Sequence, residues 1–327
     1  MNIEKGYNLS DIYLVPRQIS EINSRNDVDI SVEFCRNKLS LPLIASPMPD
    51  VCDGKMAKEL YQRGLFGFIH RFNTINEQLK EYSDTGIADC GCAIGINDEW
   101  WNRFLKLLDI GCTDFLIDTA NGANKRVGEC IEKILNKSPS VNIVAGNVAT
   151  KEGYRFLAQY PLAAIRCMIG SGSACSTRFE TAVYFSSASC LMEIVQEKNM
   201  GKTQYSPQII ADGGINNPHD FCIALAIGAN IVMCGKIFAQ CLESPARTLN
   251  IDGKLKKIYR GAASFSNQID YTGERPDYVE GFEQIIDYGG KLDDLIKRFS
   301  GGLRSAMSYL NAKNLGEFRK NANFCLG

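Results

Sequence analysis

A cysteine in a glycine-rich loop is the residue of this chain best suited to covalent chemistry. Cys175 lies in the run Ile169–Arg178 (IGSGSACSTR), where Gly170 and Gly172 permit an unusual backbone path and small hydroxyl residues surround the thiol. Exposed backbone N–H groups in such a loop favour the reactive thiolate. We therefore interpret Cys175 as a nucleophile, whereas the other twelve cysteines fit small buried core residues.

A second loop has residue types that suit a ribose and a phosphate. Asp212 precedes Gly213 and Gly214; its carboxylate can accept hydrogen bonds from both ribose hydroxyls, and the glycines let backbone N–H groups approach a phosphate. Gly235 and Gly261 could add further backbone donors. A plain tight turn would also explain the Asp-Gly-Gly run, so the phosphate interpretation depends on where this loop lies in the fold.

Short apolar runs alternate with amphipathic stretches, and together they must position these loops. Each run is too short for a helix and rich in Ile, Val, Leu or Ala, as buried parallel strands are. The eight predicted strands are Leu41–Ala45, Leu65–Ile69, Cys92–Ile96, Phe115–Asp118, Val141–Ala145, Ala163–Ile169, Gln208–Ala211 and Asn230–Cys234. Helical periodicity predicts helices between them, for example over Lys55–Arg63, Lys125–Leu135 and Asp220–Ile227. Eight strand–helix units in about 200 residues favour an α/β fold closed into a (β/α)8 TIM barrel.

The polar and glycine-rich segments follow the predicted strands directly. Enzymes with this fold carry their chemistry on the loops after the strands. The residues concerned are Ser46 and Met48 after the first strand, His70 after the second, Asp118 after the fourth, Cys175 after the sixth, Asp212 after the seventh, and Gly235 with Lys236 after the eighth. Because loops seven and eight of such barrels often bind phosphate, the position favours the phosphate interpretation of Asp-Gly-Gly.

The composition excludes several classes of partner. Hydrophobic residues make up 45% and charged residues 22%, and the net charge is −1, so there is no electrostatic case for a nucleic acid or an anionic membrane. The start MNIEKGYNLS lacks a signal-peptide pattern, and no apolar run reaches about 18 residues. We expect a cytoplasmic protein whose thirteen cysteines are reduced.

The histidines and the remaining cysteines do not predict a metal centre. There is no Cys-x-x-Cys pair, and Cys90 with Cys92 supplies only two ligands. His70 ends an apolar run and fits a hydrogen-bonded structural residue, while His219 opens a helix and fits the surface.

At the residues described above, the sequence resembles the IMP dehydrogenase/GMP reductase family. The resemblance runs from Tyr7–Pro16 (YNLSDIYLVP) to Asn314–Phe318 (NLGEF), which is nearly the whole chain. The run Ile169–Arg178 is similar to the family's catalytic loop, and Asp212–Ile215, Cys234-Gly235 and Tyr259-Arg260-Gly261 resemble its ribose and phosphate segments. The resemblance implies that residues 1–327 form a single barrel domain with a mobile flap in its C-terminal part.

In this family a cysteine thiolate adds to C2 of a purine nucleotide, and a hydride moves between C2 and a nicotinamide. The resemblance implies that Cys175 is the nucleophile and that Thr177 and Glu280, the latter in the flap, form a proton relay. The implied substrate-binding residues are Ser46, Met48, Ser173, Asp212, Gly213, Gly214, Gly235, Gly261, Ser264 and Gly281. The implied NADPH contacts are Asp118, Ala120, Asn121 and Gly122, and a potassium ion would bind at Gly170 and Gly172. The family resemblance also implies a homo-oligomer, a tetramer.

Three features favour the reductase branch, which deaminates GMP to IMP with NADPH. Only about twenty residues separate Arg71 from Cys92, which leaves no room for the regulatory domain that dehydrogenases carry there. The run Asp118–Gly122 (DTANG) resembles the reductase form, and Ser264–Glu280 lacks the Arg-Tyr dipeptide that activates water in dehydrogenases. The relay suits this chemistry because the amino group of the purine leaves poorly unless a proton is supplied so that it departs as ammonia.

Several residues depart from the reductase pattern. Phe179–Ser187 replaces a stretch with two glycines and a proline, Ala262 stands where a methionine is expected, and Ser176 replaces a threonine. Pro49 separates Met48 from an aspartate that usually follows it directly. These departures leave four alternatives open: oxidation of IMP, a modified guanine nucleotide as substrate, NADH in place of NADPH, and nucleotide binding without turnover.

Overall fold

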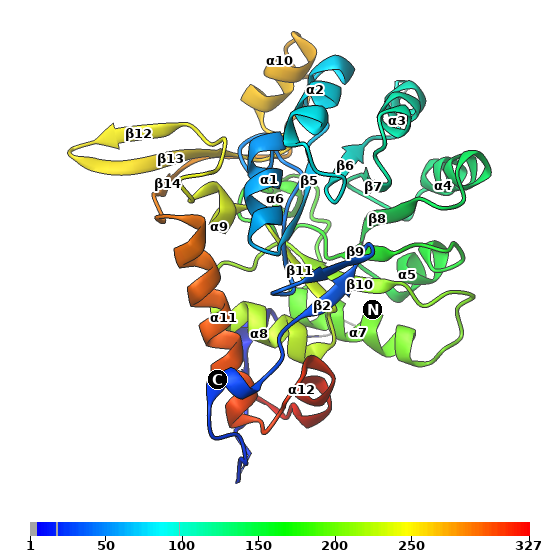
Figure 1. Cartoon of the computed structure of the whole chain (residues 1–327). Coiled ribbons are helices and arrows are strands. Elements are labelled where there is room, and N and C mark those ends of the chain that lie inside the picture. Colours follow the sequence, from blue (N-terminus) through cyan, green and yellow to red (C-terminus); the bar gives the residue numbers. More distant parts are fainter. Residues whose placement is uncertain (1–4, 18, 98) are drawn as a thin grey trace.

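A closed barrel of eight parallel strands forms the centre of the protein (Figure 1). The computed structural model describes residues 5–17, 19–97 and 99–327. The barrel strands are β4 (Leu43–Ala45), β5 (Phe66–Ile69), β6 (Gly91–Ile94), β7 (Asp114–Asp118), β8 (Asn142–Val148), β9 (Ala164–Cys167), β10 (Gln208–Asp212) and β11 (Ile231–Cys234). They follow one another in chain order, and β11 closes the barrel by pairing with β4. The predicted TIM barrel is confirmed, since each of the eight apolar runs forms a barrel strand.

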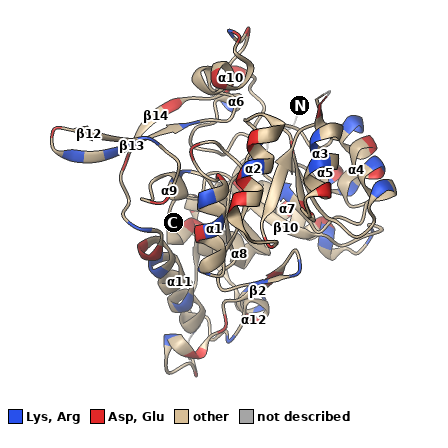
Figure 2. Ribbon diagram, turned by 45° about the horizontal axis from the view of Figure 1, so that its top comes forward, with Lys and Arg blue, Asp and Glu red and all other residues tan. Residues whose placement is uncertain are grey.

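Helices link the strands, and most of them cover the outside of the barrel, while the short helices α6 and α9 begin at residues that line the cavity described below. They are α1 (Gly54–Gln62), α2 (Ile75–Thr85), α3 (Trp100–Asp109), α4 (Lys125–Lys137), α5 (Lys151–Leu157), α6 (Thr177–Glu180), α7 (Ser187–Asn199), α8 (Pro218–Ile227) and α9 (Lys236–Ala239). Local signals set where they begin: Thr74 and Glu77 form a capping box at α2, and the Asn217 side chain caps α8 ahead of Pro218. Figure 2 shows charges of both signs mixed over these outer helices.

Further elements pack around the barrel and extend from it. Strand β1 (Ile12–Leu14) pairs with β15 (Phe324–Leu326), and β2 (Val32–Phe34) pairs with β3 (Asn37–Leu39). Strands β12 (Thr248–Ile251), β13 (Lys254–Arg260) and β14 (Glu283–Asp287) form a sheet that projects to one side (Figure 1). The remaining helices are α10 (Phe265–Thr272), α11 (Leu292–Tyr309) and α12 (Leu315–Asn321), and two short 3-10 helices cover Leu9–Asp11 and Arg25–Asp27. No helix of the described ranges is long and apolar enough to cross a membrane.

The barrel interior is apolar at one end and charged at the other. Phe66, Ile210 and Leu116 belong to the interior cluster, and the ring of Phe34 closes its amino end 5.2 Å from that of Phe66. Because side chains alternate along a strand, residues two positions further on also point inward. Asp118, Arg166 and Asp212 are therefore expected to point inward at the carboxyl ends of the strands, where the cavity described next is found.

Candidate active site

A cavity of about 460 Å³ opens at the carboxyl ends of the barrel strands. Its walls are the carboxyl ends of β7, β8, β9, β10 and β11, the loops after β4, β5, β7, β9, β10 and β11, and the segment 259–280. A volume in this range suits a ligand of nucleotide size. The cavity therefore lies where the sequence predicts the chemistry of the barrel.

Cys175 stands in the wall of this cavity at the start of a hydrogen-bonded chain. Its Sγ–H donates to Thr177 Oγ1 at 3.2 Å, and the Thr177 hydroxyl donates to Glu280 Oε2 at 2.7 Å. Cys234 also belongs to the lining, but it is buried and its Sγ–H donates to the Ile215 carbonyl at 3.4 Å. Eleven of the other twelve cysteines are buried; burial raises the pKa of Cys190 and of Cys222 to about 12, which keeps those thiols protonated.

The segment that carries Glu280 lies directly against the cysteine loop. Ser176 N–H donates to the Glu280 carbonyl at 3.1 Å, and Phe282 N–H donates to the Ala174 carbonyl at 2.9 Å. A Cβ on Gly261 would lie 2.4 Å from the Ala174 carbonyl oxygen. Glycine is therefore required at 261 because the two backbones approach so closely.

An alternating row of charged side chains forms the floor of the cavity. Arg166 Nη1 lies 2.6 Å from Asp118 Oδ1, and its Nη2 lies 2.7 Å from Asp212 Oδ2. Gly146 of β8 lies between Asp118 and Arg166 in the sheet register, and a Cβ there would meet the Arg166 Cβ at 2.6 Å. The absence of a side chain on Gly146 thus lets Arg166 reach across β8 to Asp118.

The protonation of this row is set by burial and by its own charges. Burial alone would raise the pKa of Asp118, but Arg166 and Arg71 outweigh it and hold the pKa of this carboxyl below its usual range. Burial would lower the pKa of Arg166, yet Asp212 and Asp118 raise it. Asp118 therefore remains a carboxylate and Arg166 a guanidinium at neutral pH.

Asp212 retains one carboxylate oxygen for a ligand. Its Oδ2 accepts three hydrogen bonds of 2.7 to 3.1 Å, one from Asn147 Nδ2 and two from Nε and Nη2 of Arg166. Its Oδ1 accepts no hydrogen bond from any residue that the structure describes. Gly213 and Gly214 follow with φ of 101° and 76°, a conformation that glycine adopts without strain. One oxygen is thus fixed by the barrel while the other can accept from hydroxyl groups.

The cavity collects most of the residues assigned to substrate from the sequence. Those that line it are Ser46, Met48, Ser173, Asp212, Gly213, Gly214, Gly235 and Gly261. Ser264 and Gly281 do not line it. The Ser264 side chain is buried and accepts from Asn267 N–H as the cap of α10, and a Cβ on Gly281 would lie 2.7 Å from Ser264 N. These two residues shape the segment that carries Glu280.

A second cavity of about 330 Å³ adjoins the first. The two share Arg71, Asp118, Thr119 and Ala120 as lining residues, and the second adds Asn121 among others. Gly122 lines neither cavity, and its N–H donates to the Asn147 carbonyl at 2.7 Å.

The two glycines that the resemblance assigns to a potassium ion, Gly170 and Gly172, line the first cavity. Gly170 has a φ of 76°.

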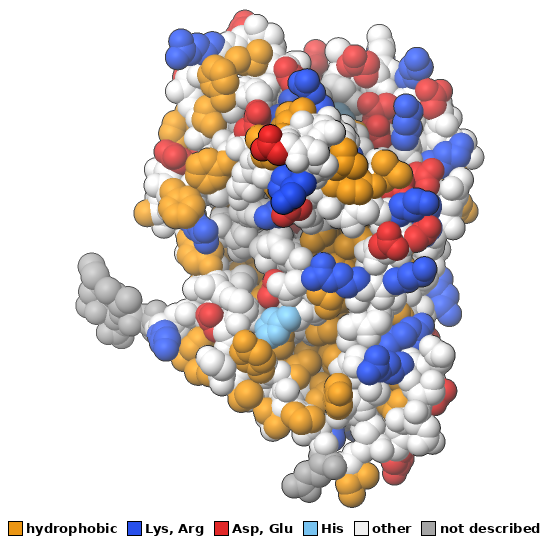
Figure 3. Space-filling view, turned by 90° about the vertical axis from the view of Figure 1, so that its left-hand side faces the viewer, with side chains coloured by type: hydrophobic (Ala, Val, Ile, Leu, Met, Phe, Trp, Pro, Cys, Tyr) orange, Lys and Arg blue, Asp and Glu red, His pale blue; other side chains and the backbone are white. Residues whose placement is uncertain are grey.

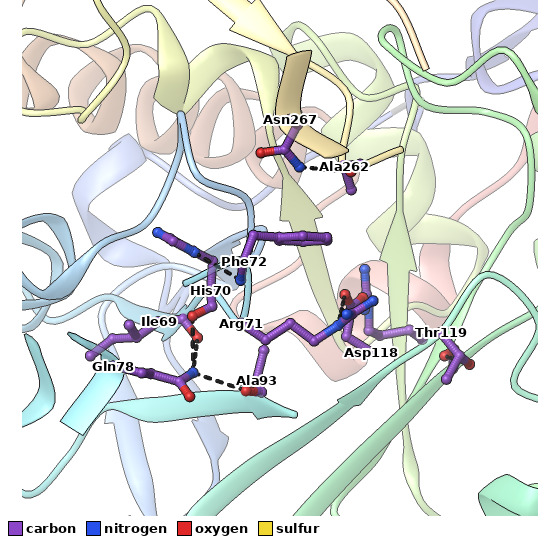
Figure 4. A network of polar contacts seen from close by, with 12 residues as sticks. Ile69, His70, Arg71, Phe72, Gln78, Ala93, Asp118, Thr119, Ala262 and Asn267 are labelled. Atoms are coloured by element: carbon purple, nitrogen blue, oxygen red, sulfur yellow. Dashed lines mark hydrogen bonds and ion pairs between the residues drawn. The ribbon is translucent and has the colours of Figure 1, made fainter. Parts of the chain in front are cut away.

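The loop after β5 adds cavity residues to which the sequence analysis gave no role. Figure 4 shows Arg71 extending toward Asp118, with Nε 3.2 Å from Oδ2, while the Phe72 ring lies toward Ala262. His70 is buried, and its Nδ1 accepts from Phe72 N–H at 3.2 Å. The Gln78 amide donates to the carbonyls of His70 and Ala93, both at 2.9 Å. The structural interpretation of His70 fits this geometry, since the histidine and Gln78 shape the loop that presents Arg71 and Phe72.

Arg166 was also missed, although the sequence contains a signal for it. It is a charged residue inside the apolar run Ala163–Ile169, and a buried charge is rarely retained without a partner. The same rule applied to Asp118 and Asp212 at neighbouring strand ends would have suggested the ion pairs.

The fold and the cavity define a (β/α)8-barrel protein with a thiol-bearing site of nucleotide size. The model of the IMP dehydrogenase / GMP reductase domain matches residues 6–326. The GMP reductases of Staphylococcus carnosus and of Streptococcus agalactiae serotype III are 30% and 31% identical over 97% and 96% of this chain. The inosine-5'-monophosphate dehydrogenase of Aquifex aeolicus is 37% identical over 74% of the chain.

The chain belongs to the IMP dehydrogenase/GMP reductase family. Members of this family are oxidoreductases that act on purine nucleotides with a nicotinamide cofactor. The matched part spans 95% and 93% of the two reductases but about half, 50%, of the Aquifex dehydrogenase.

Proposed function

We propose that this protein is an NADPH-dependent reductase that converts GMP to IMP and ammonia. The observation that carries the proposal is the pair of hydrogen bonds that links Cys175 through Thr177 to Glu280 in the wall of a nucleotide-sized cavity. The polypeptide matches GMP reductases over nearly their full length, which agrees with this choice.

The proposed reaction begins with attack by the Cys175 thiolate on C2 of the guanine ring. Glu280, through the Thr177 hydroxyl, supplies the proton with which the 2-amino group leaves as ammonia, since an amine leaves poorly as its anion. When bound, the cofactor supplies the hydride that C2 then accepts. The carbon–sulfur bond breaks with return of the electron pair to sulfur, and IMP leaves.

The nucleotide would be held by its sugar and its phosphate. The free Oδ1 of Asp212 accepts from ribose hydroxyls, and the backbone N–H groups of Gly213, Gly214, Gly235 and Gly261 surround the phosphate. Ser46, Met48 and Ser173 contact the nucleotide from the remaining walls. Ser264 and Gly281 contribute by shaping the flap rather than by touching the ligand.

The cofactor would occupy the second cavity and reach into the first. Its polar lining of Asp118, Asn121 and Asn124 beside Ala120 fits an elongated hydroxyl-rich ligand. Gly122 acts here through its backbone bond to Asn147. NADH is the alternative to NADPH, and backbone carbonyls near Gly170 and Gly172 are the proposed ligands of a potassium ion.

We further propose a cytoplasmic homotetramer. Phe179, Val183, Phe282 and Ile285 are exposed hydrophobic side chains, and exposed apolar surface often marks a contact between subunits. Figure 3 shows groups of exposed hydrophobic side chains among charged ones on the side from which β12 and β13 project. Light scattering coupled to size-exclusion chromatography gives the mass that tests this state.

The decisive assay follows NADPH absorbance in the presence of GMP and measures ammonia and IMP as products. Equal losses of NADPH and gains of ammonia and IMP would establish the reductase. Tight binding of GMP without NADPH consumption would contradict it, and would favour a modified guanine nucleotide or a binding role without turnover.

Oxidation of IMP is a second candidate, because the Aquifex dehydrogenase has the higher identity over the part it matches. It would need a group to activate water near Cys175, where the structure has Glu280 and the exposed Tyr278. IMP-dependent formation of reduced cofactor, with no reaction of GMP, would favour this candidate over the reductase.

A further inference from the structure

The cationic side chains that line the main cavity differ in their partners. Within the described ranges they are Arg71, Arg166 and Lys236. The Arg166 guanidinium is shared between Asp118 and Asp212, and Arg71 pairs with Asp118. The Lys236 ammonium makes no hydrogen bond or ion pair with any described residue. Lys236 is thus the one lining cation here whose charge is not already committed to a carboxylate.

Lys236 lies beside the glycines expected to surround the phosphate. It follows Gly235 at the end of β11, and β11 pairs with β10, which leads into Gly213 and Gly214. On its other side β11 pairs with β4, which leads into the loop of Ser46 and Met48. The side chain is half-buried, so its charge is less screened than that of a fully exposed lysine.

The Asp287 carboxylate interacts electrostatically with Lys236 but holds this charge only weakly. The hydrogen bond from Lys256 is the main reason that the pKa of Asp287 lies below its usual range, and Lys236 adds only a smaller electrostatic effect. Asp287 belongs to β14 and its side chain is 79% exposed. Solvent screens such a carboxylate strongly, so it does not neutralise Lys236.

We propose that Lys236 supplies the positive charge that binds the phosphate of the purine nucleoside monophosphate. The inference rests on the proposed function, because it names the side chain that completes the phosphate site of that nucleotide. Backbone N–H groups orient phosphate oxygens but carry no net charge, whereas an ammonium adds three donors and a full charge on a flexible stem. Lys236 thereby makes the site specific for the phosphorylated nucleotide over its nucleoside.

The test compares the binding of GMP and of guanosine by isothermal titration calorimetry. In Lys236→Gln, we expect GMP affinity to fall about ten- to a hundredfold, the effect of losing a hydrogen bond to a charged group. Guanosine affinity should stay within about twofold, since guanosine lacks the phosphate that Lys236 contacts. Lys236→Arg should recover most of the GMP affinity because it restores the charge.

Lys256→Gln is the matched control. This variant also replaces a lysine by glutamine, in strand β13, which contacts α9. Lys256 does not line the cavity. GMP affinity unchanged within about twofold in Lys236→Gln would overturn the inference, as would an equal loss for GMP and guanosine. Wild-type protein that binds neither GMP nor IMP would overturn the proposed function together with it. Wild-type protein that binds GMP but does not reduce it would overturn the reductase alone, and the comparison of GMP with guanosine would still decide the role of Lys236.

Discussion

The thiol of Cys175 differs from the other cysteine thiols of this chain in its surroundings rather than in its chemistry. Most of the others are buried among apolar groups, which disfavour the thiolate. Cys175 instead faces a cavity and donates to Thr177, which in turn donates to Glu280. The pair of hydrogen bonds gives a proton a path between the flap carboxyl and the reacting centre.

Replacement of Cys175 by alanine should abolish turnover and leave GMP affinity within about tenfold, because covalent chemistry and phosphate binding use different groups. Steady-state NADPH consumption and calorimetric GMP binding measure the two effects. Cys325→Ala is the control, since Cys325 is the exposed cysteine and lies on β15. Turnover of Cys175→Ala at a rate comparable to wild type would refute the covalent mechanism.

Replacement of Glu280 by glutamine should lower kcat about a hundredfold, the lower range for loss of a general acid. The affinity for GMP should change little, because Glu280 bonds to Thr177 and not to the phosphate site. Glu274→Gln removes a charge from the same segment at a residue that does not line the cavity. A kcat equal to that of wild type in Glu280→Gln would show that the proton comes from elsewhere.

Arg260 joins three elements next to Tyr259 and Gly261, which line the cavity. It ends β13, and its N–H and guanidinium both bind the Asp50 carboxylate in the loop after β4, with Nη2 2.8 Å from Oδ1. Its Nη1 lies 2.6 Å from Asp270 in α10. The bridge therefore ties α10 to the loop after β4 beside Gly261, which contacts the cysteine loop.

The two halves of this bridge should contribute unequally to stability. The Asp50 side chain is 6% exposed and that of Asp270 is 65% exposed. Asp50→Asn should lower the free energy of unfolding by about 3 kcal/mol, because it leaves the Arg260 charge without its buried partner. Asp270→Asn should cost less than about 1 kcal/mol, as expected for an exposed pair. Urea unfolding measures both, and equal losses would contradict this division.

The stability of the whole molecule should depend on pH through His70. Burial, followed by the charges of Arg103 and Arg260, lowers the pKa of His70 from 6.5 to about 4 in the folded protein. Because the unfolded chain binds the proton more readily, the contribution of His70 is fully present above pH 6.5 and is lost as the pH falls toward 4.

Between pH 7 and pH 5 this linkage should reduce the free energy of unfolding by roughly 2 kcal/mol. His70→Asn keeps an acceptor for Phe72 N–H but cannot take up the proton, so its stability should fall less over the same range. Urea unfolding of both proteins at the two pH values gives the comparison. The same loss in wild type and variant would exclude His70 as the cause.

The sequence by itself determined the eight strands, several helix starts and the loops that carry the chemistry. These features depend on short-range patterns: apolar runs of strand length, capping residues such as Asn217, and glycines beside a cysteine. The strand order of a closed barrel then places every loop after a strand at one end. For this reason the residues Cys175, Asp212 and Gly235 could be assigned to one site without coordinates.

Only the tertiary structure decided how side chains from distant segments share that site. It decided that Ser264 and Gly281 lie outside the cavity lining and that Arg166 occupies one oxygen of Asp212. It also decided that Lys236 makes no ion pair with any residue that the structure describes. Residues 166 and 118 lie 48 positions apart and meet only because Gly146 separates them without a side chain. Such contacts depend on distances across the closed barrel, which no local pattern of residues encodes.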